Sequence, residues 1–178
     1  MKTFEKIGIV EKIINQFFLF VYGFVKYIPV PIGYILRIAI LKLFGLKGGL
    51  GWIHDGVTIV YPWRVKLGKG WSLNERVCII PGGLITIKDN TRISNGVNII
   101  SANHNFDNVN IPIKHQGFYN DDVLIEDDVW IGANATILPG LRIGKGCVIG
   151  SGSIVNKSFA DYTIIAGNPA VEIKKRSN

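Results

Sequence analysis

The chain has 178 residues, of which 48% are hydrophobic, and it carries a formal net charge of +7 at pH 7. This length allows one domain of ordinary size with a small appendage and leaves no room for a second catalytic domain. A basic balance is typical of proteins that bind nucleic acid, anionic membranes or phosphate-bearing ligands. Because no nucleic-acid-binding motif accompanies it, we favour the last two classes and expect no nucleic-acid partner.

The first fifty residues are predicted to form two apolar helices, over about residues 5–27 and 31–45, separated by Pro29-Val30-Pro31. Neither apolar stretch reaches the roughly 20 residues that a membrane-spanning helix needs. A secretory signal peptide fits poorly, because Glu5 and Glu11 lie where such a peptide is basic. We therefore expect a cytoplasmic protein.

Two roles are open for these helices, which make up a predicted N-terminal unit, residues 1–50, ahead of the repeat domain at 51–178. They could cap the open end of a repeat domain, or residues 1–45 could lie on the cytoplasmic face of a membrane. Their aromatic density favours the membrane, and both roles are compatible. In the membrane interpretation the residues that face lipid headgroups are Lys2, Lys6, Lys12, Lys26, Arg37 and Lys42.

From residue 67 onward, aliphatic residues recur every six positions. A helix would repeat its apolar face every 3.6 residues and a half-buried strand every two, so this period predicts neither element alone. It is typical of a solenoid of very short strands, in which each side of a triangular coil points one side chain inward per hexapeptide. The recurring residues are Leu67, Leu73, Ile79, Ile87, Ile93, Ile99, Ile125, Ile131, Ile137, Ile143, Ile149 and Val155.

Smaller features agree with the solenoid. Gly132, Gly144 and Gly150 follow the aliphatic residues, where the chain is expected to turn a corner. The period slips by two at Pro81-Gly82-Gly83 and again before Leu67, which we interpret as local bulges in one continuous coil. Two cysteines, Cys78 and Cys147, occupy positions near the inward one and are expected to be core residues, not a disulfide or a metal pair.

A segment at about residues 103–122 breaks the repeat, which resumes in phase at Val123. Loops of this length inside a compact domain are usually functional or disordered. Near its start lies His104, and an imidazole is the natural acceptor for an alcohol proton at neutral pH. Taken alone, a histidine in a polar loop is more often merely solvated. His54 and His115 are interpreted as surface residues.

Three stretches resemble a known family: Ile125-Glu-Asp-Asp-Val-Trp-Ile-Gly-Ala-Asn-Ala-Thr-Ile-Leu-Pro-Gly140, Val148-Ile-Gly-Ser-Gly-Ser153 and Ala166-Gly-Asn-Pro-Ala170. They are similar to the hexapeptide-repeat acetyltransferases, specifically the sugar O-acetyltransferase branch. The resemblance implies an all-β fold, a left-handed parallel β-helix, and a homotrimer with active sites between subunits. It also implies acetyl-CoA as co-substrate, with no metal. The left hand comes from the resemblance alone, because parallel crossovers are otherwise right-handed.

The resemblance also implies roles for individual residues. His104 matches the catalytic position, which favours a general base over a solvated histidine, and the Ala133 amide matches an oxyanion donor. Asn74 matches an acceptor-contacting asparagine, although a corner residue with left-handed backbone is an equal alternative. Trp130 is large for an outward position, and the family likeness favours a wall of the acceptor site. A further set would contact the cofactor: Ala133, Ser151, Asn156, Lys157, Gly167, Asn168, Pro169 and Lys174.

The expected reaction is transfer of an acetyl group from acetyl-CoA to a sugar hydroxyl by direct attack, since the chain has no Gly-x-Ser-x-Gly elbow. The segment Pro29-Val-Pro-Ile-Gly-Tyr-Ile-Leu-Arg37 resembles members that modify cell-surface polysaccharides. N-acetylation of an amino sugar or a nucleotide-linked amino sugar is the alternative. A γ-type carbonic anhydrase is disfavoured, because no two of His54, His104 and His115 are five residues apart. A non-enzymatic scaffold trimer is the last alternative.

Overall fold

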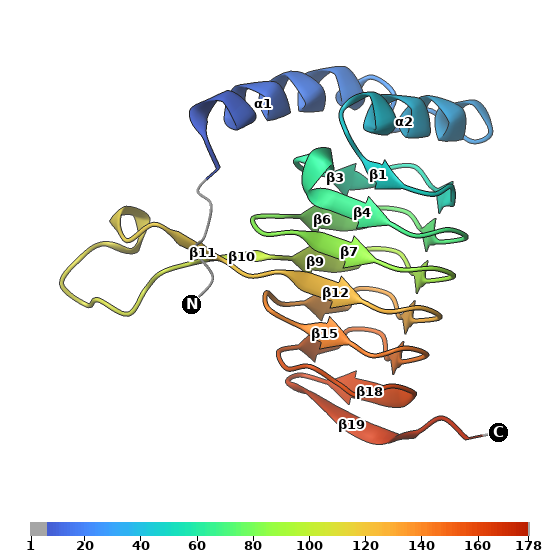
Figure 1. The fold of residues 1–178 in the computed structure, drawn as a ribbon, viewed down its shortest axis with the longest axis vertical. Helices are drawn as coiled ribbons and strands as arrows, with labels where there is room; N and C mark the ends of the chain where they lie inside the picture. Colours follow the sequence, from blue (N-terminus) through green and yellow to red (C-terminus); the bar gives the residue numbers. More distant parts are fainter. Residues whose placement is uncertain (1–6, 178) are drawn as a thin grey trace.

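The computed structural model describes residues 7–177, and the expectations for Lys2 and Lys6 fall outside them. The first helix begins at Ile9, after the non-helical Gly8, and not at about residue 5 as expected. The chain forms a parallel β-helix covered at one end by two helices (Figure 1). The strands at the front of Figure 1 run left to right, and the chain returns behind them as it descends, which is a left-handed coil. The predicted fold is therefore confirmed, and so is its hand.

Three sheets form the sides of the triangular coil, and their strands run parallel except for the antiparallel last pair, Thr163–Gly167 with Ala170–Lys175. The helices are α1 (Ile9–Gly23) and α2 (Ile32–Leu43). Face A contains β1 (Lys47–Gly48), β4 (Val65–Leu67), β7 (Ile85–Ile87), β12 (Val123–Ile125) and β15 (Arg142–Ile143). Face B contains β2 (Trp52–Ile53), β5 (Ser72–Leu73), β8 (Arg92–Ile93), β13 (Trp130–Ile131), β16 (Val148–Ile149), β18 (Thr163–Gly167) and β19 (Ala170–Lys175). Face C contains β3 (Thr58–Ile59), β6 (Cys78–Ile80), β9 (Asn98–Ile100), β14 (Thr136–Ile137) and β17 (Ile154–Val155).

The six-residue period forms the core. All twelve recurring residues are at most 1% exposed. Each packs directly on its equivalent in the next coil, as Ile131 does between Ile93 and Ile149. Ile53 and Ile59 are equally buried and extend the series by one coil toward the helices. Of the two cysteines, Cys147 is buried as expected, whereas Cys78 is only half-buried, and neither forms a disulfide.

Two structural requirements act at the corners of the coil: a positive φ at one position, and space for the neighbouring coil at another. Positive φ occurs at a position that recurs every six residues, for example at Asn134, Gly140 and Gly146. Gly132, Gly144 and Gly150 lie at corners as expected, but none of them has positive φ. Instead the coils stack too closely for a side chain there, because a Cβ on Gly132 would lie 2.6 Å from the Ser151 amide nitrogen.

All insertions into the repeat leave from the edge between faces C and A. The two slips lie at this C–A edge, one at the short 3₁₀ helix η1 (Pro62–Arg64) and one at residues 81–83. The third insertion is a hairpin of β10 (Ala102–His104) and β11 (Phe118–Asn120), carrying the 3₁₀ helix η2 (Ile113–His115). This hairpin, which we call the arm, projects sideways from the coil (Figure 1) and is the predicted protruding segment.

The two helices pack over one end of the coil (Figure 1). Phe18, Tyr22 and Leu41 are buried on the first coil, and the Tyr22 hydroxyl donates to the Val57 carbonyl at 3.2 Å. Glu11 fastens α1 to the C–A edge, because its carboxylate accepts hydrogen bonds from Trp63 and Arg64 at 3.0–3.1 Å. Burial would raise the pKa of Glu11, but those bonds and one from the Gly8 amide lower it below its ordinary value.

Arg37 corrects the list of basic residues expected to face lipid. Its side chain is fully buried, and it donates to the carbonyls of Val25, Lys26 and Ile28 and, on the first coil, of Ile53. The first three carbonyls follow the C-terminus of α1, where the helix dipole favours a cation. Arg37 therefore joins the two helices to the coil and is not a headgroup ligand. No described helix is long and apolar enough to cross a membrane.

We predict that Ile137→Ala lowers the free energy of unfolding by about 2–5 kcal/mol, because it leaves a cavity between two coils. Thr136→Ala, on the outward side of the same strand, is the matched control and should change it by less than about 0.5 kcal/mol. Equilibrium urea denaturation measures both. Equal losses for the two variants would contradict the assignment of inward and outward positions.

Candidate functional site

The arm carries His104 away from the coil on a two-stranded ribbon. His104 faces Phe118 across the strands, with ring centroids 4.1 Å apart, and its side chain is exposed. The His104 amide donates to Asn103 Oδ1 at 2.9 Å, and Asn103 Nδ2 donates to the Tyr119 hydroxyl at 3.2 Å. The imidazole is thus positioned by ring packing and is open to a ligand. Asp107 is exposed, and among the described residues no hydrogen bond or ion pair joins it to His104.

Internal hydrogen bonds shape the arm. Gln116 Nε2 donates to the carbonyls of Asn108 and Ile111 at 2.8 and 2.7 Å, and Asn105 Nδ2 donates to the Gln116 carbonyl. At the root of the arm, the buried Ser101 hydroxyl accepts from the Gly82 amide and donates to the Gly83 carbonyl. The direction of the arm is therefore set by the coil. His115 lies exposed in η2, as expected.

Asn74 and Trp130 lie beside the edge between faces B and C. Trp130 points outward from face B with 53% of its surface exposed, and its Nε1 donates to Ser94 Oγ at 3.2 Å. Ser94 follows Asn74 by one coil, since the Asn74 amide donates to the Ile93 carbonyl. Asn74 does not have positive φ, and Arg76 takes the left-handed position of that corner. The left-handed corner interpretation of Asn74 was therefore wrong.

Two of the expected cofactor residues stack on this B–C edge. The Gly152 amide donates to the Ala133 carbonyl at 2.8 Å, which places Ser151 one coil below Ala133. Within residues 7–177 the amides of Ala133 and Ser151 donate to no backbone or side-chain acceptor. Two amide donors in successive coils are thus open to a bound molecule. The turn Gly167-Asn168-Pro169 joins β18 to β19 at the same edge, and the Gly167 amide donates to Ser153 Oγ.

The remaining expected residues lie elsewhere. Asn156 and Lys157 follow β17 and so lie at the C–A edge, where Lys157 Nζ is 5.6 Å from the centre of the Phe159 ring. Lys174 is exposed on β19, opposite Ile164. Within one chain, face C separates His104 from Asn74, Trp130 and Ala133. A single chain therefore does not assemble the predicted site.

Some residues near Asn74 were missed. His54 was interpreted as a surface residue, but it is half-buried, and its Nδ1 lies 3.1 Å from Glu75 Oε1. His54 precedes Asn74 by one coil in the same column, since its amide donates to the Leu73 carbonyl. The length of a coil could have revealed this alignment. A regular coil has three hexapeptides, or eighteen residues, and a two-residue slip lengthens it to twenty, which is the spacing of His54, Asn74 and Ser94. The side chains of His54, Asp55 and Glu75 lie within reach of one ion, but the His54–Glu75 pair explains their proximity, and we assign no metal.

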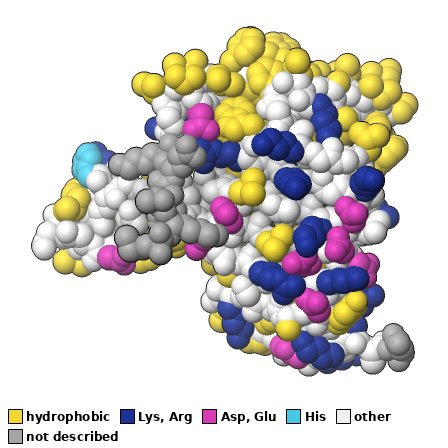
Figure 2. All heavy atoms as spheres, in the orientation of Figure 1, with side chains coloured by type: hydrophobic (Ala, Val, Ile, Leu, Met, Phe, Trp, Pro, Cys, Tyr) yellow, Lys and Arg dark blue, Asp and Glu magenta, His cyan; other side chains and the backbone are white. Residues whose placement is uncertain are grey.

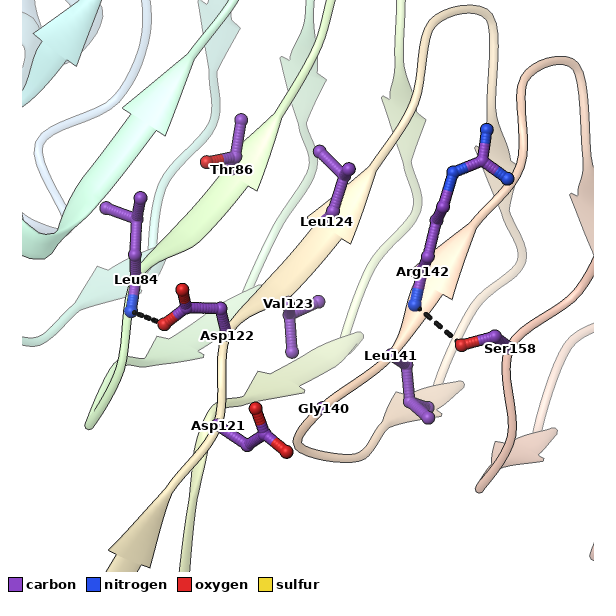
Figure 3. Close-up of a pocket in the computed structure, with 10 residues that line it drawn as sticks. All are labelled: Leu84, Thr86, Asp121, Asp122, Val123, Leu124, Gly140, Leu141, Arg142 and Ser158. Carbon is purple, nitrogen blue, oxygen red and sulfur yellow. Dashed lines mark hydrogen bonds between the residues drawn. The ribbon is translucent and has the colours of Figure 1, made fainter. Parts of the chain in front are cut away.

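A hollow of about 380 Å³ lies on face A beside the root of the arm (Figure 3). The Asp122 carboxylate accepts from the Leu84 amide at 2.8 Å, and Ser158 Oγ accepts from the Arg142 amide at 2.9 Å. None of the predicted site residues lines it. Its lining is Leu84, Thr86, Asp121, Asp122, Val123, Leu124, Gly140, Leu141, Arg142 and Ser158.

Comparison with known proteins identifies the repeat. Residues 122–157 match the family described as bacterial transferase hexapeptide (six repeats). A Mycobacterium tuberculosis protein named as a probable acetyltransferase is 38% identical over 123 residues, which are 69% of this chain and 39% of that protein. The solved structure of a maltose O-acetyltransferase from Clostridium difficile superposes with a TM-score of 0.85 at 25% identity, covering 96% of this chain and 90% of the other. The chain belongs to the hexapeptide-repeat family.

A second solved structure is similar to nearly the whole chain, helices included. A galactoside acetyltransferase solved in complex with coenzyme A has a TM-score of 0.83 at 23% identity, covering 96% of this chain and 84% of that one. At this identity the likeness shows the fold alone. The chain spans between 39% and 60% of the length of the first curated relatives that it matches.

We predict that Gly132→Ala destabilises the protein by about 1–3 kcal/mol, since the new methyl group would press on the Ser151 amide nitrogen and the Ile149 carbonyl oxygen. Gly23→Ala is the control, because a Cβ there meets nothing within 4 Å. Thermal denaturation compares the two variants. An unchanged melting temperature for Gly132→Ala would show that the corner has more room than the stacked coils indicate.

Proposed function

We propose that this protein transfers the acetyl group of acetyl-CoA to a hydroxyl of a sugar, with His104 as the general base. One observation carries the proposal: an exposed imidazole stands on an arm at one edge of a hexapeptide solenoid, and another edge presents Trp130 beside unpaired backbone amides. The name of one solved neighbour supports it, since the structure that matches at 25% identity is a maltose O-acetyltransferase.

The site is proposed to form between subunits of a homotrimer, with the arm of one subunit reaching the B–C edge of the next. The arm exposes several apolar side chains, including Phe106, Ile113 and Val109, which is 94% exposed. A lone two-stranded ribbon is marginally stable in water, so these side chains need a partner surface. A head-to-tail contact between different patches closes into a ring when the rotation is threefold.

In the proposed reaction His104 removes the proton of the acceptor hydroxyl while that oxygen attacks the thioester carbonyl of acetyl-CoA. The carbonyl oxygen becomes an oxyanion and receives a hydrogen bond from the Ala133 amide, a type of contact that contributes about 3–4 kcal/mol. Coenzyme A then leaves as the thiolate, the acetyl ester remains on the sugar, and the proton on His104 is released. Asn74 and Trp130 hold the acceptor.

Acetyl-CoA would lie in the groove between subunits, where the B–C edge of one meets the C–A edge of another. This arrangement unites the two groups of expected cofactor residues. Ala133 and Ser151 would bind the pantetheine amides, and the turn Gly167-Asn168-Pro169 would lie beneath. The residues nearest the nucleotide would be Asn156, Lys157 and Lys174, and the ammonium groups of the two lysines suit phosphates.

We predict that His104→Ala lowers kcat by about 10²–10⁴, the usual contribution of a positioned base, and leaves acetyl-CoA binding nearly unchanged. His115→Ala, on the same arm, is the matched control. Release of free thiol from acetyl-CoA with glucosides, galactosides and amino sugars as acceptors measures turnover, and calorimetry measures binding. Equal loss of turnover and binding would make His104 structural, and acetylation of amino sugars only would favour the N-acetyltransferase alternative.

We also propose that the helices rest on the cytoplasmic face of a membrane, where the acceptor belongs to cell-surface polysaccharide synthesis. Large apolar side chains cover the outer side of both helices (Figure 2). Lys12 is exposed beside them and could meet anionic headgroups. We call this surface the crown, and its members are Ile9, Val10, Ile13, Phe17, Phe20, Phe24, Ile32, Ile35 and Leu43.

We predict that the double variant Phe17→Asp, Phe20→Asp abolishes flotation with vesicles of phosphatidylglycerol and phosphatidylethanolamine, because it places charges in the crown. This test is sharper than deleting the helices, which would uncover the first coil. Ile173→Asp, exposed at the far end of the coil, is the control. Flotation of the double variant at the level of the unmodified protein would count against the crown as a membrane contact.

A further inference from the structure

A second exposed tryptophan lies on the same face as Trp130. Trp52 is 46% exposed at the outward position of β2. Its ring stacks on Tyr34 of α2 with centroids 4.5 Å apart and an angle of 21°, and Tyr34 is held by a hydrogen bond from its hydroxyl to the Gly51 carbonyl. His54 meets the Trp52 ring at 67°. Trp52 is therefore a positioned ring with an open surface.

The strand register places Trp52 and Trp130 in one outward row. Trp52 pairs with Ser72, Ser72 with Arg92, and Arg92 with Trp130. Neighbouring strands are about 4.8 Å apart, so the two tryptophans are separated by roughly 14 Å along the coil. Between them lie Ser72, whose small side chain is buried, and Arg92, which is exposed. We call this row the face-B strip.

Polar groups follow one side of the strip, on the adjoining B–C edge. His54, Asn74 and Ser94 lie in consecutive coils there. Ser94 is bound to Trp130 Nε1, and His54 is paired with Glu75. A row with aromatic rings at its ends and hydrogen-bonding side chains along its border matches a carbohydrate, whose C–H faces pack on aromatic rings while its hydroxyls need polar partners.

We propose that the face-B strip binds an acceptor of several sugar units, with the reacting unit at Trp130 and Asn74 and a more distant unit on Trp52. This inference rests on the proposed function and narrows its acceptor from a free monosaccharide to an oligosaccharide or polymer. A separation of roughly 14 Å exceeds one sugar ring. The strip begins beside α2, so a bound glycan that extends beyond Trp52 runs toward the helix-covered end of the coil.

The alternative is that Trp52 only fastens α2 to the first coil. Trp63 provides a matched comparison, because it fastens α1 by donating to Glu11 at the same end of the coil but lies at the C–A edge, away from the strip. A purely structural role would make Trp52→Ala and Trp63→Ala behave alike. If Trp52 binds the acceptor, the effect of Trp52→Ala on activity should depend on the length of the acceptor, and the effect of Trp63→Ala should not.

The test compares glucose with maltotetraose and N-acetylglucosamine with chitotetraose, using thiol release from acetyl-CoA. In the unmodified protein we expect kcat/KM for a tetrasaccharide to exceed that for its monosaccharide at least 10-fold. Trp52→Ala should lower this ratio at least 10-fold through KM, and Trp63→Ala should leave the ratio unchanged. A ratio near one in the unmodified protein, or the same ratio in Trp52→Ala, would overturn the proposal.

A measurement of tetrasaccharide binding distinguishes the proposed face-B strip from the proposed acetyl transfer. Saturation-transfer NMR with the same tetrasaccharides reports contact without turnover. Binding that is lost in Trp52→Ala but accompanied by no acetyl transfer would support the strip and overturn the proposed reaction. Acetyl transfer to monosaccharides, with no tetrasaccharide binding, would support the reaction and overturn the strip.

Discussion

The structure depends on the stacking of one aliphatic side chain on its equivalent in the next coil. Strands of two or three residues have too few hydrogen bonds to be stable alone, so each is fixed by the strands above and below it. Ile131 between Ile93 and Ile149 is one such contact, and the same arrangement recurs on all three faces. Because every coil repeats it, the outward positions form straight rows, and function depends on what those rows carry.

An end of such a stack exposes a core, and the N-terminal helices cover it. Their inner sides bury Phe18, Tyr22 and Leu41, and the buried Arg37 ties the end of α1 to the first coil. Their outer sides remain apolar, so capping the coil leaves much of their hydrophobic surface in contact with solvent. This exposed apolar surface is the reason for the proposed membrane contact.

The proposed site residues are distributed over two edges, with His104 on the arm at the C–A edge and Trp130 with Asn74 beside the B–C edge. A rigid prism cannot bring its own edges together, so a site that uses both needs a second copy. The face-B strip, by contrast, lies on one chain, because the strand register alone aligns Trp52 with Trp130.

The sequence by itself determined the solenoid, its inward residues, the two helices and the projecting arm, because these follow from local periodicity and from breaks in it. It did not show that Arg37 is buried or that Gly132 is required by the neighbouring coil, since both depend on groups brought close only by folding. The alignment of Trp52 with Trp130 and of His54 with Asn74 was likewise decided by the tertiary structure. The insertions change the number of residues per coil, so position in the chain becomes position on a face only once the coils are stacked.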